Sequence, residues 1–211
     1  MYLTEALLNS VRCPRLYFKG VGEMTKYTAR DVAEFFLRQA DPMVRDIMSN
    51  MKLQKLVYYA QGFYLAAFDK PLFEDKIEAR DHGPVVTSLY PVYKTAKSGH
   101  INPSADYQLP EFDENASSIL GYVYQLLGKC SAFELRKMSH QGTPWQNAYN
   151  KGNRTAIPHQ NMREYFRELI LSSPNIPPGA LEVVGHLNED GIYVIPRDED
   201  CNTNWSEYAA V

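Results

Sequence analysis

Cysteine is scarce in this chain of 211 residues: only Cys13, Cys130 and Cys201 are present, and they lie far apart. An odd number of widely spaced cysteines does not suit a disulfide framework and is typical of a reducing compartment. Long apolar runs are also absent, since no segment approaches the roughly 20 residues that cross a membrane. Residues 1–20 lack the continuous apolar stretch of a signal peptide. The sequence therefore predicts a cytoplasmic protein with no membrane partner.

Excess charge of one sign is lacking as well. The formal net charge is -3, so the chain does not have the basic surface that non-specific nucleic-acid binding requires. Nucleic acid is therefore not an expected partner. The phosphate-binding loop, the dinucleotide-binding G-x-G-x-x-G pattern and the G-x-S-x-G hydrolase elbow are all missing. We expect no bound cofactor.

Aromatic residues, by contrast, are plentiful: they make up 12% of the chain, and 15 of them are tyrosines. Tyrosine combines a large apolar ring with a polar tip, which suits half-buried and interface positions. With 45% hydrophobic and 22% charged residues, the composition is that of an ordinary globular protein. The length fits one domain with a substantial core and some additions.

Three regions differ in composition. Residues 1–23 show no sustained periodicity and Met24 opens a segment that looks like a natural start, so we interpret 1–23 as a disordered or mis-started extension. Residues 24–171 carry the helical patterns of the expected domain. Residues 172–211 form a Pro-rich linker and a tail, in which Asn188 to Gly191 separates two apolar runs as in a β-hairpin.

The spacing of apolar residues predicts a mainly α fold, a compact bundle of about six to seven helices with a small β element near 73–79 and a C-terminal β-hairpin. The strongest helix covers 51–68 and should be central, because it is apolar around much of its circumference. Gly62 within it would be explained by the close approach of another backbone. Other helices are expected over 28–40, 113–127, 131–138 and 161–171.

Local signals place further helix starts. Capping-box spacing is found for Thr28 with Asp31, Ser131 with Glu134, and Thr143 with Gln146. The Gly83-Pro84 pair predicts another helix start, with Pro84 near the first helical position, Val85, Val86, Leu89 and Val92 on its apolar side, and Pro91 kinking or ending it.

Two segments together resemble a known family. One is LQKLVYYAQGFYLA followed by PLF and HGPVV, and the other is SAFELRKMSHQGTPW. Their order and spacing resemble the Panacea domain, also called SocA-like and common in bacterial and prophage genomes, from about Thr28 to Ile170. The sequence departs from the family at Arg80, where members often carry an aromatic residue, and at Gly142, where they often carry an acidic one.

The resemblance implies a mainly helical antitoxin that neutralises a cognate toxin, encoded beside it, by direct protein–protein binding. One branch of the family instead presents its toxin to a cellular protease, so a proteolytic adaptor is the alternative function. The domain is not known as an enzyme. No helix-turn-helix pattern precedes the domain, which leaves no basis in the sequence for regulation of its own operon.

Histidine chemistry gives a third hypothesis, a metal hydrolase that uses His82, His140 and His159. The competing interpretation is that each imidazole bonds backbone at a helix boundary, which is favoured because no H-E-x-x-H pattern or close Cys/His pair is present. Cys130 precedes a capped helix start and could be read as a nucleophile, or as a plain small residue before a turn.

Trp145 and Tyr149 can be interpreted as interface anchors or as part of the core. The acidic tail Asp198-Glu199-Asp200 is a solvated end, or a mimic of nucleic acid against a basic toxin. The candidate partner-binding residues are His82, Gly83, Pro84, Tyr90, His140, Trp145 and Tyr149. We predict no catalytic residues and no metal ligands.

Overall fold

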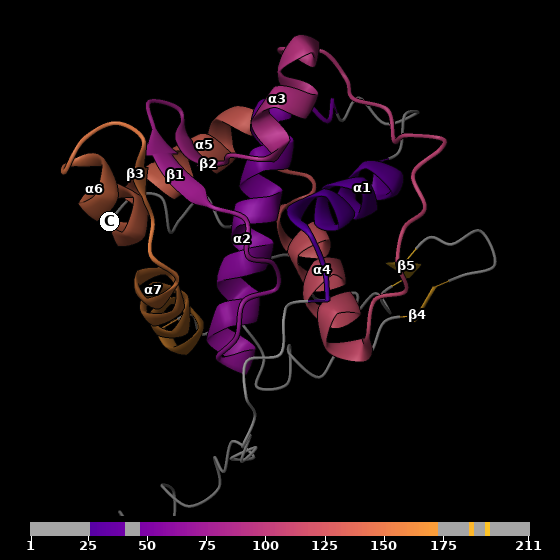
Figure 1. Cartoon of the computed structure of the whole chain (residues 1–211). Helices are drawn as coiled ribbons and strands as arrows, with labels where there is room; N and C mark the ends of the chain where they lie inside the picture. The colour runs from indigo at the N-terminus through magenta and orange to yellow at the C-terminus, as the bar shows by residue number, and fades with distance from the viewer. Residues whose placement is uncertain (1–25, 41–46, 173–185, 188–192, 195–211) are drawn as a thin grey trace, which may run out of the picture.

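The computed structural model describes residues 26–40, 47–172, 186–187 and 193–194. Within these ranges the fold is mainly helical, with seven α-helices and a small three-stranded antiparallel sheet of order β2-β1-β3 (Figure 1). The helices are α1 (Ala29–Gln39), α2 (Asn50–Phe68), α3 (Leu89–Tyr93, followed by the 3-10 turn η1, Lys94–Ala96), α4 (Glu114–Leu127), α5 (Ala132–Gln141), α6 (Thr143–Tyr149) and α7 (His159–Ser172). The predicted fold class is confirmed.

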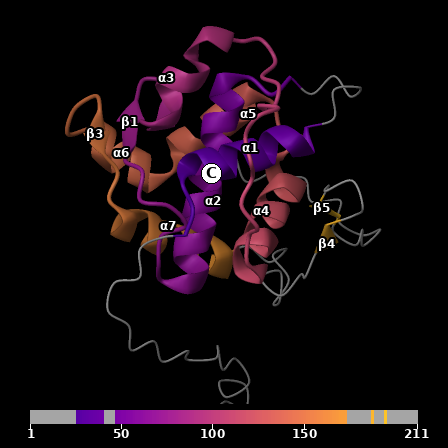
Figure 2. The same cartoon turned by 45° about the vertical axis from the view of Figure 1, so that its right-hand side comes forward.

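Helix α2 is the centre of the molecule, as its apolar circumference predicted. Figures 1 and 2 show α2 running through the middle, with α1 and α4 on one side and α7 and the sheet on the other. Ser49 caps its start by accepting a hydrogen bond from the Lys52 amide, and Asp69 ends it in the left-handed conformation. From Lys52 to Ala66 every residue of α2 is buried, so this helix is the main source of core contacts.

Gly62 marks the place where α7 crosses α2. A Cβ at this position would lie 2.2 Å from Cε2 of Phe166, whose ring is fully buried. The nearest neighbour is therefore an aromatic side chain of α7. The Phe166 ring also makes edge contacts with Tyr58, Tyr59 and Phe63. Glycine at position 62 leaves the space that this ring fills.

The sheet is built around the hairpin of β1 (Ile77–Arg80) and β2 (Gly83–Val86), and β3 (Thr155–Ala156) pairs with the other edge of β1. The helix predicted to begin at Gly83-Pro84 is wrong, because these residues are strand and the helix begins only at Leu89. Gly83 has φ 95°, which is incompatible with the first turn of a right-handed helix. Val85 and Val86 are β-branched and favour the paired strand.

Local capping signals were correct at two of three helices. Capping boxes are present at Thr28 with Asp31 and at Ser131 with Glu134. At α6 the cap residue is Gly142, which makes no side-chain hydrogen bond, and Thr143 is already helical. The Gln146 side chain does not close a box there, because its Nε2 donates to the His140 carbonyl at 3.0 Å.

Helix ends shift by a few residues: α5 continues past Met138 to Gln141, and α7 begins at His159 instead of Asn161. The predicted C-terminal hairpin is confirmed by β4 (His186–Leu187) and β5 (Tyr193–Val194), which pair antiparallel. The extension 1–23, Cys13, Cys201 and the acidic tail residues Asp198 to Asp200 lie outside the described residues.

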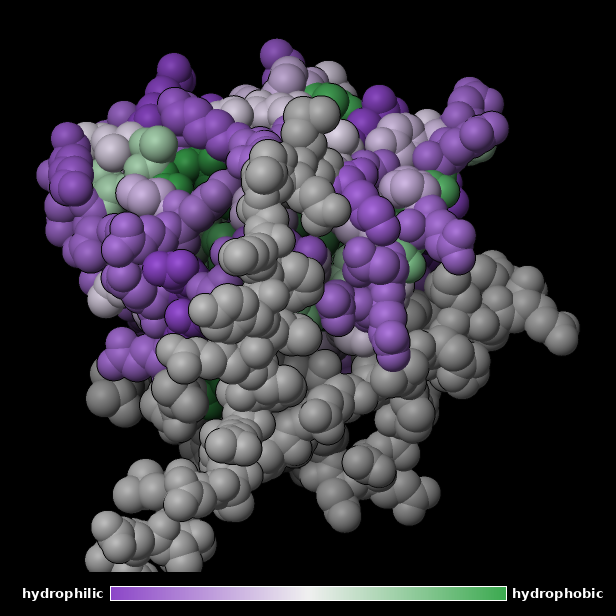
Figure 3. Space-filling view, turned by 60° about the horizontal axis from the view of Figure 1, so that its bottom comes forward, coloured by the Kyte–Doolittle hydropathy of each residue, from purple (hydrophilic) through white to green (hydrophobic). Residues whose placement is uncertain are grey.

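The surface is polar where it is described on the face shown in Figure 3, with apolar residues in small separate patches. In the described part of the chain, no helix is long and apolar enough to span a membrane.

Candidate partner-binding site

The β1–β2 hairpin forms the tip of the candidate site. Asp81 and His82 make its turn and are both exposed, whereas Gly83 and Pro84 are buried. Two features of the structure require glycine at position 83. Its φ of 95° favours glycine, and a Cβ would lie 2.7 Å from Cε of Lys55 and 2.8 Å from Oγ of Ser139. The hairpin can therefore seat against α2 and α5 only because this residue has no side chain.

A buried lysine fastens the hairpin to α2. Nζ of Lys55 donates to the carbonyl of Pro84 at 2.9 Å, and one residue earlier on the same helix Oε1 of Gln54 accepts from the amide of Val86 at 2.8 Å. Burial, with a smaller effect of the nearby Arg136 charge, lowers the pKa of Lys55 to about 7. The hairpin position is thus determined by polar groups that are hidden from water.

An aromatic stack joins α5 to α6 beside the hairpin. The His140 ring lies 3.9 Å from the Trp145 ring at an interplanar angle of 8°, and Tyr149 continues the stack at 4.7 Å. Two hydrogen bonds link the stack to the hairpin: Trp145 Nε1 donates to the Arg80 carbonyl at 3.1 Å, and Tyr149 Oη donates to Asp81 Oδ1 at 2.7 Å. Trp145 is buried and Tyr149 half-buried.

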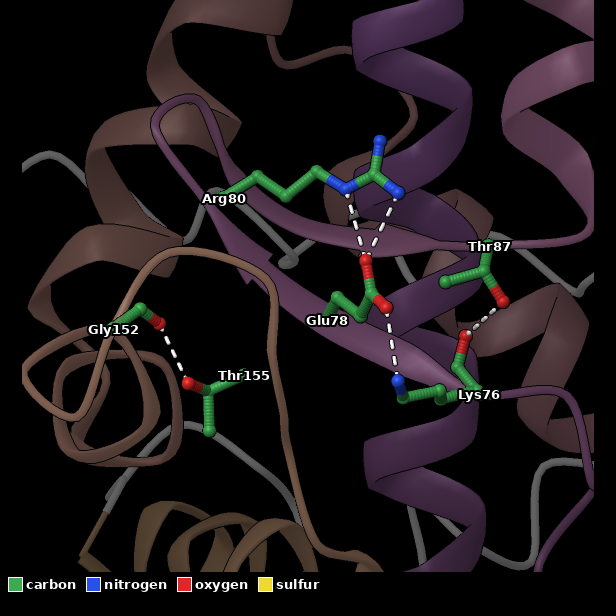
Figure 4. A network of polar contacts seen from close by, with 6 residues as sticks. All are labelled: Lys76, Glu78, Arg80, Thr87, Gly152 and Thr155. Atoms are coloured by element: carbon green, nitrogen blue, oxygen red, sulfur yellow. Dashed lines mark hydrogen bonds and ion pairs between the residues drawn. The ribbon is translucent and has the colours of Figure 1, made fainter.

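Arg80 connects Tyr90, the remaining candidate residue, to this corner. Its guanidinium lies over the Tyr90 ring, 4.9 Å from the centroid. Figure 4 shows the same guanidinium bonded to Glu78 through both Nε and Nη2, while Lys76 binds the other Glu78 oxygen. Thr155, on β3, bonds the Gly152 carbonyl beyond the other edge of β1. Arg80 therefore holds its guanidinium against an aromatic ring at the edge of this corner.

All seven residues that the sequence singled out are brought to this one corner of the fold: His82, Gly83, Pro84, Tyr90, His140, Trp145 and Tyr149. Four are exposed or half-buried at its surface, namely His82, Tyr90, His140 and Tyr149, and Tyr90 keeps 41% of its surface exposed. The buried members determine the shape of the corner, and the others lie at its surface, where a partner can contact them.

The histidines behave differently from one another. Burial is the main cause that lowers the pKa of His140 to about 4, and the charges of Arg136, Lys55 and His82 add to it. Nε2 of His140 is buried with no hydrogen-bond partner, so stacking, and not a bond from Nε2 to backbone, positions this ring. Nε2 of His159 lies 3.2 Å from Nε2 of Gln61. Among the described residues, no group of three His, Cys, Asp or Glu side chains is placed to hold a metal ion.

Sequence reasoning missed the buried polar side chains of α2. Gln61 bonds the amides of Leu72 and Phe73 through Oε1 and the Phe73 carbonyl through Nε2. Lys52 donates to the Gly128 carbonyl at 2.6 Å. The available signal was four long polar residues within a helix that is otherwise apolar all round, since such residues must find partners when buried.

The fold and this corner define a mainly helical domain that displays an aromatic and cationic surface beside a short hairpin. Residues 53–146, from the second turn of α2 into α6, match the family described as "Antitoxin SocA-like, Panacea domain". The chain is also 30% identical over 168 residues to "Antitoxin SocA" of Caulobacter vibrioides (strain NA1000 / CB15N), covering 72% of this chain and 88% of that protein.

The chain therefore belongs to the Panacea-domain family of SocA-like antitoxins. The resemblance seen in its motifs is confirmed. No solved structure gives a significant match.

Proposed function

We propose that this protein is the antitoxin of a toxin–antitoxin pair and neutralises its cognate toxin by direct protein–protein binding. The observation that carries the proposal is the 30% identity to Antitoxin SocA across 88% of that protein. Within this proposal the protein acts by binding, without a catalytic centre, and the toxin is its main partner.

The candidate corner supports a binding role for the exposed residues His82 and Tyr90 and the half-buried Tyr149. Tyrosine is enriched in binding hot spots because a large rigid ring loses little conformational entropy on contact. The side chains beneath are held by the Lys55, Trp145 and Asp81 hydrogen bonds already described. Such support gives a surface that is ordered before binding, which lowers the entropic cost of association.

Co-expression with the gene next to this one tests the proposal. We expect the neighbouring product to stop growth when expressed alone, growth to return when this protein is present, and the two proteins to co-purify. A neighbouring product that is harmless alone, or that stays toxic in the presence of this protein, would contradict the proposed function.

The mechanism can be separated from the function in the same strain. Blocking by binding predicts that the toxin accumulates in the complex and that its half-life is unchanged or longer. A toxin half-life that shortens when this protein is expressed would instead indicate delivery to a protease, and would contradict neutralisation by binding alone.

The contact surface is tested by truncating exposed rings. Tyr90→Ala combined with His82→Ala should weaken toxin binding while leaving the melting temperature nearly unchanged, because surface substitutions usually change stability by less than about 0.5 kcal/mol. Gln125→Ala is the matched control, since Gln125 is exposed on α4, which lies across α2 from the hairpin. Equal binding by both variants would remove this corner from the interface.

We also propose that residues 24–171 form the functional domain and that 1–23 and 172–211 are additions to it. Expression of 24–171 alone should then rescue growth as well as the full chain does. Loss of rescue by a truncated protein that is folded, judged by its circular dichroism and cooperative melting, would assign a role to the additions.

A further inference from the structure

One face of α5 is exposed next to the candidate corner and has a composition of its own. Phe133, Arg136, Lys137, His140 and Gln141 follow the i, i+3, i+4, i+7, i+8 spacing of a single helix face and line a pocket of about 280 Å³. On the opposite side of the helix, Leu135 and Ser139 are buried. We refer to these five lining residues as the α5 face.

The α5 face carries positive charges that no acidic residue in the described part of the chain pairs with. Within the described part of the chain, no Asp or Glu forms an ion pair with Arg136 or Lys137. The acidic residue of this helix, Glu134, lies off the face and closes the capping box with Ser131. Nε of Arg136 is buried and has no hydrogen-bond partner. This donor is not used within the fold, and Arg136 also lines the pocket, where its charge can meet an anionic group.

Two further titratable groups, Lys55 and His140, lie close to Arg136. The Arg136 charge is near enough to Lys55 and to His140 to lower the pKa of both. With pKa values lowered to about 7 and about 4, Lys55 and His140 carry little positive charge above neutral pH, so Arg136 is the permanent cation that an incoming carboxylate would offset. Arginine presents its donors in a planar fork that matches a carboxylate, so Arg136 is suited to be the primary contact.

The apolar part of the α5 face sets the second requirement for a ligand. Phe133 is 67% exposed, the highest fraction among the large exposed apolar residues of the described chain. A ligand that covers this ring needs an apolar side chain beside its carboxylate. An acidic protein segment that also carries apolar residues meets both requirements. A nucleic acid fits less well, because the face offers two permanent cations and the chain is negative overall.

We propose that the α5 face is a docking site for an acidic, apolar-containing segment of the partner protein, with a carboxylate on Arg136 and an apolar side chain on Phe133. The proposal rests on the proposed function, since it takes the cognate toxin to be the source of that segment. It adds a second contact region on α5 to the exposed rings of the hairpin corner.

A direct test uses the full-length protein and a fluorescent short peptide of alternating aspartate and leucine. Binding is followed by fluorescence anisotropy at low salt, with the asparagine–leucine peptide as the uncharged control. We expect the acidic peptide to bind, and Arg136→Met to weaken it about tenfold, the loss expected for one charge-assisted hydrogen bond. Phe133→Ser should weaken both peptides, because it removes the apolar contact.

Lys151→Glu is the matched charge control, since Lys151 is exposed beyond the end of α6 and outside the α5 face. It should bind the acidic peptide as the unaltered protein does. Equal affinity for the aspartate and asparagine peptides, equal loss in Lys151→Glu and Arg136→Met, or tighter binding of a single-stranded thymidine oligomer than of the acidic peptide would overturn the proposal. Melting curves check that each variant is folded.

The protein's own acidic tail is the remaining competitor for the α5 face. Neutralising it in the full chain with Asp198→Asn, Glu199→Gln and Asp200→Asn should leave peptide affinity unchanged. A tenfold gain in affinity would show that the occupant is this tail, and the proposal for a partner segment would be wrong.

Co-expression separates this inference from the proposed function. If the unaltered protein rescues cells from the toxin and the double variant Arg136→Met with Lys137→Met does so equally well, the α5 docking site is wrong while the antitoxin function stands. If the unaltered protein gives no rescue, the function fails, and the peptide experiment still decides whether the α5 face binds acidic segments. Rescue that is lost in the double variant and kept in Lys151→Glu supports both the antitoxin function and the α5 docking site.

Discussion

Helices α2 and α5 both carry basic residues, yet they place them in opposite surroundings. On α2 the amines of Lys52 and Lys55 are buried and each donates to a backbone carbonyl of another segment, Gly128 and Pro84 respectively. On α5 Lys137 is exposed, and Arg136 keeps a buried Nε–H that no acceptor satisfies.

The contrast shows how one residue type can serve the fold in one place and remain available for a partner in another. A buried cation whose donors are satisfied within the chain has little left to offer a ligand, and removing it disturbs the elements it joins. A cation at the surface with an open donor adds little to stability but can give specificity when a complementary group arrives. Substitutions on the two helices can test this division between α2 and α5.

The largest expected difference concerns the aromatic residues associated with the two helices. Phe166 fills the space over Gly62 of α2, whereas Phe133 projects from α5 into solvent. Phe166→Ala should lower the free energy of unfolding by about 3–5 kcal/mol, the range for a buried phenylalanine. Phe133→Ala should change it by less than about 0.5 kcal/mol. Urea denaturation measures both, and similar losses in the two variants would contradict the comparison.

A smaller loss is expected when α2 is made to carry one extra methyl group. Gly62→Ala places a Cβ 2.2 Å from the Phe166 ring, and this ring cannot move freely because it is packed among Tyr58, Tyr59 and Phe63. Overpacking of this kind costs about 1–3 kcal/mol.

Two controls sharpen the Gly62→Ala prediction. Gly142→Ala should cost clearly less, since its Cβ would keep 3.4 Å from Tyr165. The double variant Gly62→Ala with Phe166→Leu should lose less stability than the sum of the single variants, because the two changes share one space. Additive losses would show that the ring is not the obstacle.

The buried amine of Lys55 on α2 predicts a pH dependence of stability. The pKa of Lys55 is lowered from 10.5 to about 7 by burial and, to a lesser extent, by Arg136. Between these two values the unfolded chain binds a proton that the folded chain does not. The free energy of unfolding contributed by Lys55 therefore rises as pH increases from about 7 towards 10.5, and is lowest below pH 7.

Urea denaturation across that range measures the effect as a difference between variants. The stability of the unaltered protein relative to Lys55→Met should increase with pH above 7. A constant difference for Lys55→Met would mean that the Lys55 amine remains protonated in the folded protein.

Local sequence signals predicted the helices well because the forces involved are local. The capping boxes of Thr28 and Ser131 need only residues three positions away, and the apolar spacing of α2 and α7 was enough to place both. The β2 strand could not be found in this way. Pro84 suits a helix start as well as a strand, and the choice was made by pairing with Ile77–Arg80 and by the Lys55 bond, which involve distant parts of the chain.

For the candidate site, the sequence singled out residues that the fold brings together, and their role in binding stays a prediction. The spacing of HGP, Tyr90 and TPW gave the residues of the corner but not how they meet. Trp145 reaches the Arg80 carbonyl across 65 positions in the sequence, and Tyr149 reaches Asp81 across 68. The charges of the α5 face could not be found from the sequence for another reason: Arg136 and Lys137 look like ordinary solvated residues, and only the structure shows that no carboxylate among the described residues pairs with them. Buried Lys55 was hidden in the same way among the apolar residues of its helix.

The smallest predicted effect is a change in the pKa of His140. It leaves stability nearly unchanged and depends on the charge of the α5 face. Burial lowers the pKa of His140 to about 4, and the Arg136 charge is the next cause, followed by Lys55 and His82. Arg136→Met should therefore raise the pKa of His140, whereas Lys137→Met should move it less, since Lys137 is not among these causes. The imidazole resonances of His140, followed by NMR as pH falls from 7, measure the midpoint of its titration.

A midpoint near 6.5 in the unaltered protein would show that the α5 face is not a repulsive cationic setting. The distinction between the two helices would then lose its electrostatic basis. A low midpoint that rises when the aspartate–leucine peptide is added would show the opposite, because a carboxylate on Arg136 offsets the charge that His140 experiences.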